Sequence, residues 1–151
     1  MEINTAIRNY KYRFTIGTLV TNMNQYDEMK RSLIEAGFNE DDCEYLYINN
    51  TNGNYLCGYQ GLNKILIQSQ GEYVILCHQD IRAIDKRAVL ESRIDELDTL
   101  DPSWAVLGNA GLSDETGQYS IRMTGHTGLP AKIGKLPTKT SAVDENLIIV
   151  K

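Results

Sequence analysis

The apolar and polar stretches in the first half of the chain alternate in a way that predicts three strands separated by two helices. Short, partly β-branched apolar runs at Arg13–Val20, Glu44–Ile48 and Glu72–Cys77 are typical of strands. Apolar residues at helical spacing predict one helix over about 25–36 and another between the second and third runs. Helices that connect strands in this order give parallel strands with right-handed crossovers. The polar turns after the three strands are therefore expected to meet at one edge of a sheet.

The boundaries of these helices and their core-facing positions follow from the same pattern. Asn24 is the predicted N-cap of the first helix, with Asp27 in its first turn and Gly37 beyond its end. The stripes expected to face the core are Tyr26, Met29 and Leu33 in the first helix and Tyr59, Leu62, Ile65 and Leu66 in the second.

The second half of the chain predicts a third helix and a less regular C-terminal segment. Asp85 is the predicted cap of this helix, and Asp101-Pro102 stops it. A fourth strand is predicted at 104–108 and a last one at Glu145–Val150. Between them, a stretch rich in Gly and Pro predicts a long loop. Its expected features are a short strand at Tyr119–Met123 and a turn at 125–128, and the core stripe of the third helix is Leu90, Ile94 and Leu97.

Together these elements predict the α/β class. We expect a mostly parallel, Rossmann-like sheet with helices on both faces and a loop or β-hairpin segment at the C-terminal end. A length of 151 residues suits one domain. The expected organisation is an N-terminal lead-in at 1–12 and a single domain at 13–151.

Charge and cysteine content remove several classes of function. A net charge of −5 and the lack of a basic cluster argue against nucleic-acid binding. No apolar run approaches the roughly 20 residues that span a bilayer, so we expect no transmembrane segment and a cytoplasmic location. Cys43, Cys57 and Cys77 are odd in number and lack CxxC spacing, which indicates neither a disulfide framework nor a zinc site.

Chemistry is expected where the third strand ends. His78, Gln79 and Asp80 follow the apolar run at once, and ligands of open α/β sheets bind beyond the carboxyl ends of the strands. One carboxylate there can hold Mg²⁺ or Mn²⁺ through a substrate's diphosphate, because phosphate oxygens supply the other ligands. His78 is a second candidate ligand for Mn²⁺. The other interpretation is a polar turn with a hydrogen-bonded structural histidine.

The second strand runs into a loop dense in amides, Asn49-Asn50-Thr51-Asn52-Gly53-Asn54. Asparagine readily adopts left-handed backbone conformations, so a tight multi-turn loop explains this composition. Contact with a ligand explains it equally well. The sequence has no Walker-type phosphate loop, no GxGxxG after the first strand, no HExxH and no GxSxG, the motifs of several other enzyme classes.

The order of these motifs resembles the donor-binding half of family-two glycosyltransferases, which have the GT-A fold. The resemblance covers about residues 13–112 and rests on the polar turns, on Gly58-Tyr-Gln-Gly61-Leu-Asn63 and on GEYVILCHQD at 71–80. It implies a domain that binds a nucleoside-diphosphate sugar and transfers the sugar to an acceptor hydroxyl on a glycan or another molecule. Mn²⁺ or Mg²⁺ is the implied cofactor.

The resemblance also implies roles for single residues. Asp80 matches the last acid of the family's DxD-type motif, and His78 stands where the first acid is usual, so both are implied metal ligands. Asn49-Asn50-Thr51 takes the place of an acidic motif that contacts the base and ribose. The implied nucleotide-sugar-binding residues are Thr21, Asn22, Asn49, Asn50, Thr51, Asn63, Gln79 and Asn109.

Two departures from the family pattern bear on mechanism. Amides replace the acids of the base pocket, and one metal-binding acid is missing. The family's catalytic base lies beyond the last strand of this chain, so we expect the acceptor part to be truncated. The candidate bases are Asp144 and Glu145, the only acids after residue 115.

Two other functions remain as alternatives to sugar transfer. The first is a non-catalytic nucleotide-sugar-binding or protein-interaction module with the same fold. The second is a regulator-like α/β domain, which is disfavoured because Thr21-Asn22-Met23-Asn24 holds none of the acids that such domains carry after the first strand.

Overall fold

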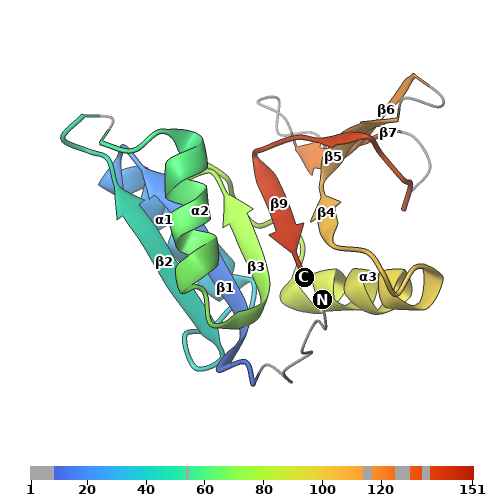
Figure 1. Ribbon diagram of the computed structural model, residues 1–151, viewed down its shortest axis with the longest axis horizontal. Helices are drawn as coiled ribbons and strands as arrows, with labels where there is room; N and C mark the ends of the chain where they lie inside the picture. The colour runs from blue at the N-terminus through green and yellow to red at the C-terminus, as the bar shows by residue number, and fades with distance from the viewer. Residues whose placement is uncertain (1–8, 54, 114–116, 125–129, 134–136) are drawn as a thin grey trace, which may run out of the picture.

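The computed structural model has an α/β fold with three helices, a five-stranded mixed sheet and a smaller C-terminal sheet (Figure 1). It describes residues 9–53, 55–113, 117–124, 130–133 and 137–151. The elements in chain order are β1 (Tyr12–Val20), α1 (Met23–Glu35), β2 (Cys43–Asn49), α2 (Gly58–Gln68), β3 (Gly71–Cys77), α3 (Arg87–Leu100), β4 (Val106–Gly108), β5 (Ala110–Ser113), β6 (Gln118–Thr124), β7 (Pro130–Ile133), β8 (Ala142–Val143) and β9 (Leu147–Val150).

The large sheet has the strand order β2-β1-β3-β9-β4. Strands β2 and β3 both pair with β1 in parallel, which confirms the predicted parallel core. Strand β9 lies antiparallel between β3 and β4, so β4 runs in the same direction as β3. The carboxyl ends of β1 to β4 and the beginning of β9 therefore lie at one edge of the sheet.

Helices cover both faces of this sheet, as the sequence predicts. On one face, Met29 of α1 and Ile94 of α3 belong to a buried cluster with Phe14 and other strand residues. On the other face, Ile65 of α2 packs with Leu76 of β3 in a second cluster. Figure 1 shows α2 in front of the strands and α1 behind them. Burial of apolar side chains on both faces explains why the strands read as nearly continuous apolar runs.

Close approach of α2 to the sheet depends on two glycines. A Cβ atom at Gly17 of β1 would overlap the Ile65 side chain, and one at Gly61 of α2 would lie 2.8 Å from Leu19. Side chains larger than hydrogen at either position would push the helix away from the strands. Gly61, the second glycine of the Gly58-x-x-Gly61 segment, thus has a packing role in this fold.

Three details of the predicted helices are wrong. Asn22, not Asn24, is the N-cap of α1, so Asp27 lies beyond the first turn. Lys86, not Asp85, is the residue before α3. Tyr59 is 87% exposed, because α2 begins at Gly58 and places this side chain in its first turn, away from the core. The other predicted stripe residues are buried or packed against the core.

The C-terminal segment contains more strands than the sequence predicts. Its sheet has the order β7-β6-β5-β8, and the predicted strand Tyr119–Met123 lies within β6. The predicted turn at 125–128 lies outside the described residues. In the part of the chain that is described, every helix is too short or too polar to cross a membrane.

Candidate functional site

The turns after β1, β2 and β3 meet at the carboxyl edge of the parallel core. Val20 and Asn49 are register partners in neighbouring strands, and the Asn50 amide N–H donates to the Val20 carbonyl oxygen over 2.7 Å. On the far side of β3, the His78 amide N–H donates to the Asn146 carbonyl oxygen over 3.0 Å. Backbone hydrogen bonds therefore connect the second turn to the first and the third turn to the start of β9.

The side chain of Gln79 ties the first turn to the third. Its Oε1 accepts from the backbone N–H groups of Thr21 (2.8 Å) and Asn22 (3.0 Å). Its Nε2 donates to the Thr21 hydroxyl oxygen over 2.8 Å and to Gln25 Oε1 over 3.0 Å. A primary amide has two donor hydrogens and two acceptor lone pairs, so these four bonds account for all of them. Gln79 holds the turns in place and has no further hydrogen-bonding group for a ligand.

Asn22 and Asn49 are exposed residues whose side-chain oxygens are bonded to the fold. Asn22 Oδ1 caps α1 by accepting from the N–H groups of Asn24 (3.0 Å) and Gln25 (3.3 Å). Asn49 Oδ1 accepts from the Thr51 backbone N–H over 3.0 Å and from the Thr51 hydroxyl over 2.7 Å. Both asparagines are exposed at the surface. They remain able to contact a ligand, although only through nitrogen.

Asn50 builds the amide-rich loop from inside. It is 5% exposed, its Nδ2 donates to the Leu56 carbonyl oxygen over 2.9 Å, and its Oδ1 accepts from the Leu56 N–H over 3.3 Å. These contacts support the turn interpretation for this residue. A ligand cannot reach the Asn50 side chain without opening the loop.

His78 and Asp80 are exposed at the end of β3, next to the structural Gln79. Within the described residues, no three His, Cys, Asp or Glu side chains are arranged to hold a metal ion by themselves. An exposed imidazole and an exposed carboxylate are donor types that a divalent cation can use when it takes most of its ligands from phosphate oxygens, which is how Mg²⁺ is commonly bound in substrate complexes. The donor set suits Mn²⁺ because it joins an imidazole to a carboxylate.

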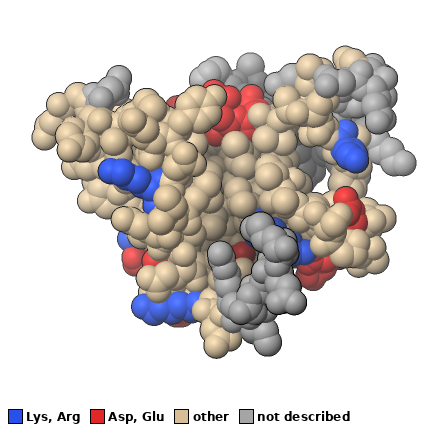
Figure 2. Space-filling view, in the orientation of Figure 1, with Lys and Arg blue, Asp and Glu red and all other residues tan. Residues whose placement is uncertain are grey.

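Asp144 and Glu145 lie at the same edge, in the turn that leads into β9. Asp144 Oδ1 accepts from the backbone N–H and the side-chain Nδ2 of Asn146, over 3.0 and 2.9 Å. Glu145 is exposed. Figure 2 shows acidic side chains gathered at this edge, near the start of β9. The structure thus brings both predicted base candidates to the edge that carries His78, although both are far from His78 in the sequence.

Two clefts meet at Asn109, which follows β4. One, of about 540 Å³, lies between the C-terminal half of α3, β4 and residues 137–143. The other, of about 400 Å³, runs along α3 toward β9. Asn109 Oδ1 is buried and has no hydrogen-bond partner among the described residues. Asn63, by contrast, lies on the exposed face of α2.

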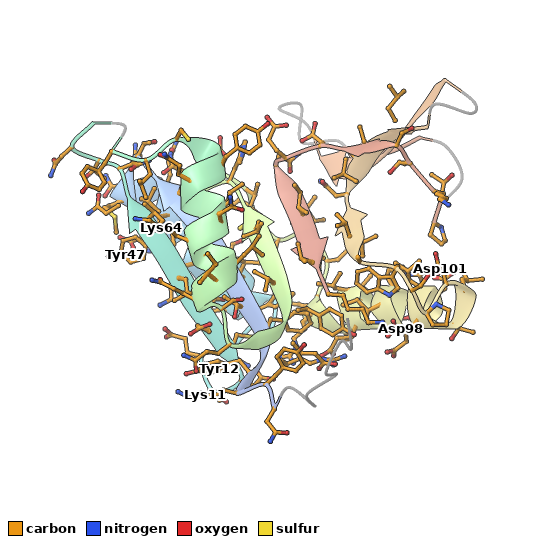
Figure 3. The ribbon with its side chains drawn as sticks, in the orientation of Figure 1. Lys11, Tyr12, Tyr47, Lys64, Asp98 and Asp101 are labelled. Atoms are coloured by element: carbon orange, nitrogen blue, oxygen red, sulfur yellow. The ribbon has the colours of Figure 1, made fainter. Side chains whose placement is uncertain are left out.

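Buried groups beneath the edge are held in their neutral forms. Burial raises the pKa of the Cys77 thiol to about 11, and the thiol lies 3.5 Å from the Thr18 hydroxyl. Burial and the neighbouring Tyr47 hydroxyl raise the pKa of Tyr26 to about 12. Figure 3 shows Tyr47 on the outer side of β2. Neither Cys77 nor Tyr26 ionises near neutral pH, so neither serves as a nucleophile or base there.

Gln25 and Asn146 contribute to the edge and were missed by the sequence analysis. Gln25 looks like an ordinary first-turn helix residue, and its contact with Gln79 depends on the packing of β1 beside β3. Asn146 had a recognisable local signal. The Asp-Glu-Asn spacing before an apolar run is typical of a turn in which the aspartate bonds the backbone two residues ahead.

No model of a known protein family matches this chain. A protein of Fuscovulum blasticum described as "ATP synthase subunits region ORF 6" is 28% identical over 144 residues, which cover 91% of this chain. The match covers 58% of that protein, so the chain spans less than two thirds of its relative's length. That description names no activity and no ligand. Function must therefore be argued from the site.

Proposed function

We propose that the chain binds a nucleoside-diphosphate sugar at the carboxyl edge of the sheet and transfers the sugar to an acceptor hydroxyl, as GT-A glycosyltransferases do. The observation that carries this proposal is the connection of three strand-end turns at one edge, with exposed Asp80 on the third turn. To bind a donor of this class, the protein must contact the nucleoside at one place and the diphosphate at another, and the ligand fixes the distance between the two places. The Gln79 side chain supplies that separation by joining the first turn to the third.

The residues have four different roles in this proposal. Thr21, Asn22, Asn49 and Thr51 contact the nucleoside, while Asn50 and Gln79 hold their turns in position. Asp80 and His78 hold a divalent cation whose charge offsets that of the departing diphosphate. Asn63 and Asn109 flank the donor on α2 and after β4.

The reaction is a displacement at the anomeric carbon. The acceptor oxygen forms a bond to this carbon, the bond from the carbon to the diphosphate oxygen breaks, and the diphosphate leaves with the electron pair. The acceptor proton passes to a carboxylate in the Asp144-Glu145 turn. Glu145 is the better base, because it is exposed whereas an Asp144 oxygen already accepts two bonds from Asn146. The clefts beside Asn109 provide room for the acceptor.

Thermal unfolding with nucleoside diphosphates and sugar nucleotides, with and without Mn²⁺, tests donor binding. A ligand at a hundredfold excess over its Kd stabilises the fold by about 2.7 kcal/mol. That gain corresponds to a rise in Tm of roughly 5–10 °C for a domain of this size. We expect Asp80→Asn to abolish the Mn²⁺-dependent part of the shift and to leave the Tm without ligand unchanged. Asp41→Asn is the matched control, because this exposed acid lies at the opposite edge of the sheet.

Several outcomes would contradict parts of this proposal. A folded Asp80→Asn variant that keeps Mn²⁺-dependent binding would remove Asp80 from the site. The absence of any shift with all nucleotides would overturn the proposed function. His78→Ala separates ligand from structural roles: a metal ligand loses affinity and keeps stability, whereas a structural histidine does the reverse.

A non-catalytic nucleotide-sugar-binding module is the second candidate. It is favoured by one observation: one carboxylate oxygen of Asp144, a candidate base, already accepts two hydrogen bonds from Asn146 inside the turn, which leaves Glu145 as the more available of the two candidates. Release of nucleoside diphosphate in the presence of acceptors distinguishes the two functions. Turnover that Glu145→Gln abolishes supports the transferase, whereas tight donor binding without turnover across a broad acceptor panel supports the module.

A further inference from the structure

Gln79 is the middle residue of the third turn, between the exposed metal-ligand candidates His78 and Asp80. Its side chain reaches across to the first turn, where Oε1 accepts from the Thr21 and Asn22 backbone N–H groups over 2.8 and 3.0 Å. A backbone N–H can only donate, so the terminal atom that faces both groups must be the amide oxygen. The orientation of the Gln79 amide is therefore fixed by the backbone of the first turn.

The first turn also has anchors that do not involve Gln79. At its start, the Val20 carbonyl oxygen accepts from the Asn50 N–H over 2.7 Å, which connects it to the second turn. At its end, Asn22 Oδ1 caps α1 by accepting from two backbone N–H groups, over 3.0 and 3.3 Å. The first two turns, which form the nucleoside half of the proposed site, are therefore held together without the Gln79 side chain.

The third turn, which forms the diphosphate half of the proposed site, is held from its other side. The His78 N–H donates to the Asn146 carbonyl oxygen over 3.0 Å, just before β9. The segment that follows the turn is bonded to α1, because the Ala83 N–H donates to the Ser32 hydroxyl oxygen over 2.8 Å. Neither bond involves the first turn. Among the hydrogen bonds of the described residues, only those of Gln79 join the first turn to the third.

A nucleoside diphosphate must bridge the two halves, whereas a nucleoside needs only the first. A ligand that bridges two contact points gains from both only when their separation matches its own length. If the protein does not hold this separation in advance, binding must order it, and part of the affinity is lost. The hydrogen bonds of the Gln79 amide to Thr21, Asn22 and Gln25 hold the separation before the ligand arrives.

We propose, resting on the function proposed above, that Gln79 is a positioning residue for the donor. It makes the two halves of the site one preformed unit, so its loss weakens ligands that bridge the halves and spares ligands that occupy one half. All donor hydrogens and acceptor lone pairs of its amide are bonded to the fold, so it acts through the turns and not by a bond to the ligand. Gln25, whose Oε1 accepts from Gln79 Nε2 over 3.0 Å, supports it from α1.

Amide hydrogen exchange in the unliganded chain tests the connection between the turns. Gln79→Met keeps the length of the side chain and removes its amide, so exchange at the Thr21 and Asn22 N–H groups should become about tenfold faster. Gln79→Glu should keep exchange slow, because a carboxylate oxygen accepts from the same groups. The Asn50 N–H, which is bonded to Val20, is the internal reference and should not change. Unchanged exchange in Gln79→Met would overturn the inference whether or not the chain binds nucleotides.

Titration then separates positioning from a general effect on the fold. UDP, CDP, GDP and ADP with Mn²⁺ are the bridging probes, and the corresponding nucleosides probe the first half alone. We expect Gln79→Met to raise the Kd of the tightest diphosphate about tenfold, the cost of ordering one residue again on binding. The Kd of its nucleoside should change by less than about twofold. Equal losses for the two ligands, or an unchanged Kd for the diphosphate, would overturn the positioning role and leave the proposed donor site intact.

Gln68→Met is the matched control, because this exposed glutamine lies at the end of α2 that is remote from the candidate edge. It should change neither Kd. If Gln79→Met does not fold, Gln25→Leu takes its place, since it removes one bond of the Gln79 amide. It should weaken the diphosphate selectively, by about threefold, and an unchanged Kd would overturn the inference. Failure of the unmodified chain to bind any nucleotide would overturn both proposals.

Discussion

At the scale of single residues, neighbouring amides of one loop have opposite roles. Asn49 and Asn50 are adjacent in sequence, yet Asn49 is exposed and Asn50 is 5% exposed. Asn49 is the last residue of β2, whereas Asn50 begins the loop that folds back over it and bonds its side chain to Leu56. The two amides look alike in the sequence, but Asn50 is a buried part of the fold and Asn49 is exposed at the surface.

Asn50→Asp is expected to destabilise the fold by about 2–3 kcal/mol. The change removes the hydrogen bond to the Leu56 carbonyl oxygen and leaves a negative charge in a buried position. Urea unfolding of this variant beside Asn52→Asp measures the effect, because Asn52 takes the same substitution at an exposed position. Equal midpoints for the two variants would show that the Asn50 contacts are not needed.

Asp42 gives the fold a pH-dependent contact with α3. A hydrogen bond of 2.8 Å from Arg87, together with an ion-pair contact of 2.7 Å to the same guanidinium, lowers the pKa of Asp42 below its ordinary value of 3.8. A carboxyl whose pKa is lower in the folded state stabilises the fold above pH 3.8 and loses this effect as the pH falls through the folded pKa.

We therefore expect Asp42→Asn to lower the Tm at pH 6 by roughly 2 °C, since a partly exposed pair contributes up to about 1 kcal/mol. The difference from the unmodified chain should shrink progressively below pH 4 and vanish in stronger acid. Tm measurements from pH 2 to pH 7 check this, with exposed Asp41→Asn as the control. A difference that stays constant across that range would contradict a role for the ionised carboxylate.

At the scale of elements, the distance between α2 and the strands depends on a glycine. A methyl group on Gly17 would overlap Ile65 Cγ2 and lie 3.2 Å from Leu76 Cδ2, both of which belong to buried side chains. Well-packed side chains of this kind have little freedom to move aside. Because α2 begins at the candidate edge, displacement of the helix would also disturb the site.

Gly17→Ala is expected to destabilise the fold by about 1–3 kcal/mol through overpacking. Gly58→Ala provides the contrast, because a Cβ at Gly58 meets nothing within 4 Å and alanine favours helix. Guanidinium unfolding should therefore place the Gly17→Ala midpoint well below that of Gly58→Ala. A Gly17→Ala midpoint equal to that of the unmodified chain would show that the helix is free to shift.

At the scale of the whole molecule, β9 joins the two parts of the large sheet. It pairs with β3 on one side and with β4 on the other, and Ile149 at its centre is 2% exposed. Lys151, which follows β9, donates to Asp98 Oδ1 over 2.5 Å, and Figure 3 shows Asp98 on α3. Without β9, the β4 edge would lose its only connection to the parallel core within the large sheet.

Deletion of residues 147–151 should prevent cooperative folding, because it exposes the unpaired edges of β3 and β4 together with the Ile149 site. Lys151→Ala serves as the control and should change stability by less than about 1 kcal/mol, since its ion pair is partly exposed. Circular dichroism on heating and resistance to proteolysis measure the outcome. A shortened chain that still unfolds cooperatively would show that β1 to β3 form an independent core.

Local sequence patterns specify the elements of the first hundred residues. Each strand and helix there is specified by the spacing at which apolar residues recur and by the turn residues at its ends. The short connections between these elements make the parallel core predictable as well. The sequence also placed His78, Gln79 and Asp80 at the end of the third strand, because that strand stops where its apolar run stops. The C-terminal segment was less predictable, since its short strands depend on pairing partners far along the chain.

The hydrogen bonds of the polar residues at the edge depend instead on how distant segments pack together. Gln79 is a clamp because β1 lies beside β3, and Asn50 is internal because its loop folds back to Leu56. The antiparallel direction of β9, which brings Asp144 and Glu145 to the same edge, follows from pairing with β3 residues at least 70 positions earlier. Local patterns specify how a segment folds, whereas the partner of each side-chain hydrogen bond depends on which segments the complete sheet brings together.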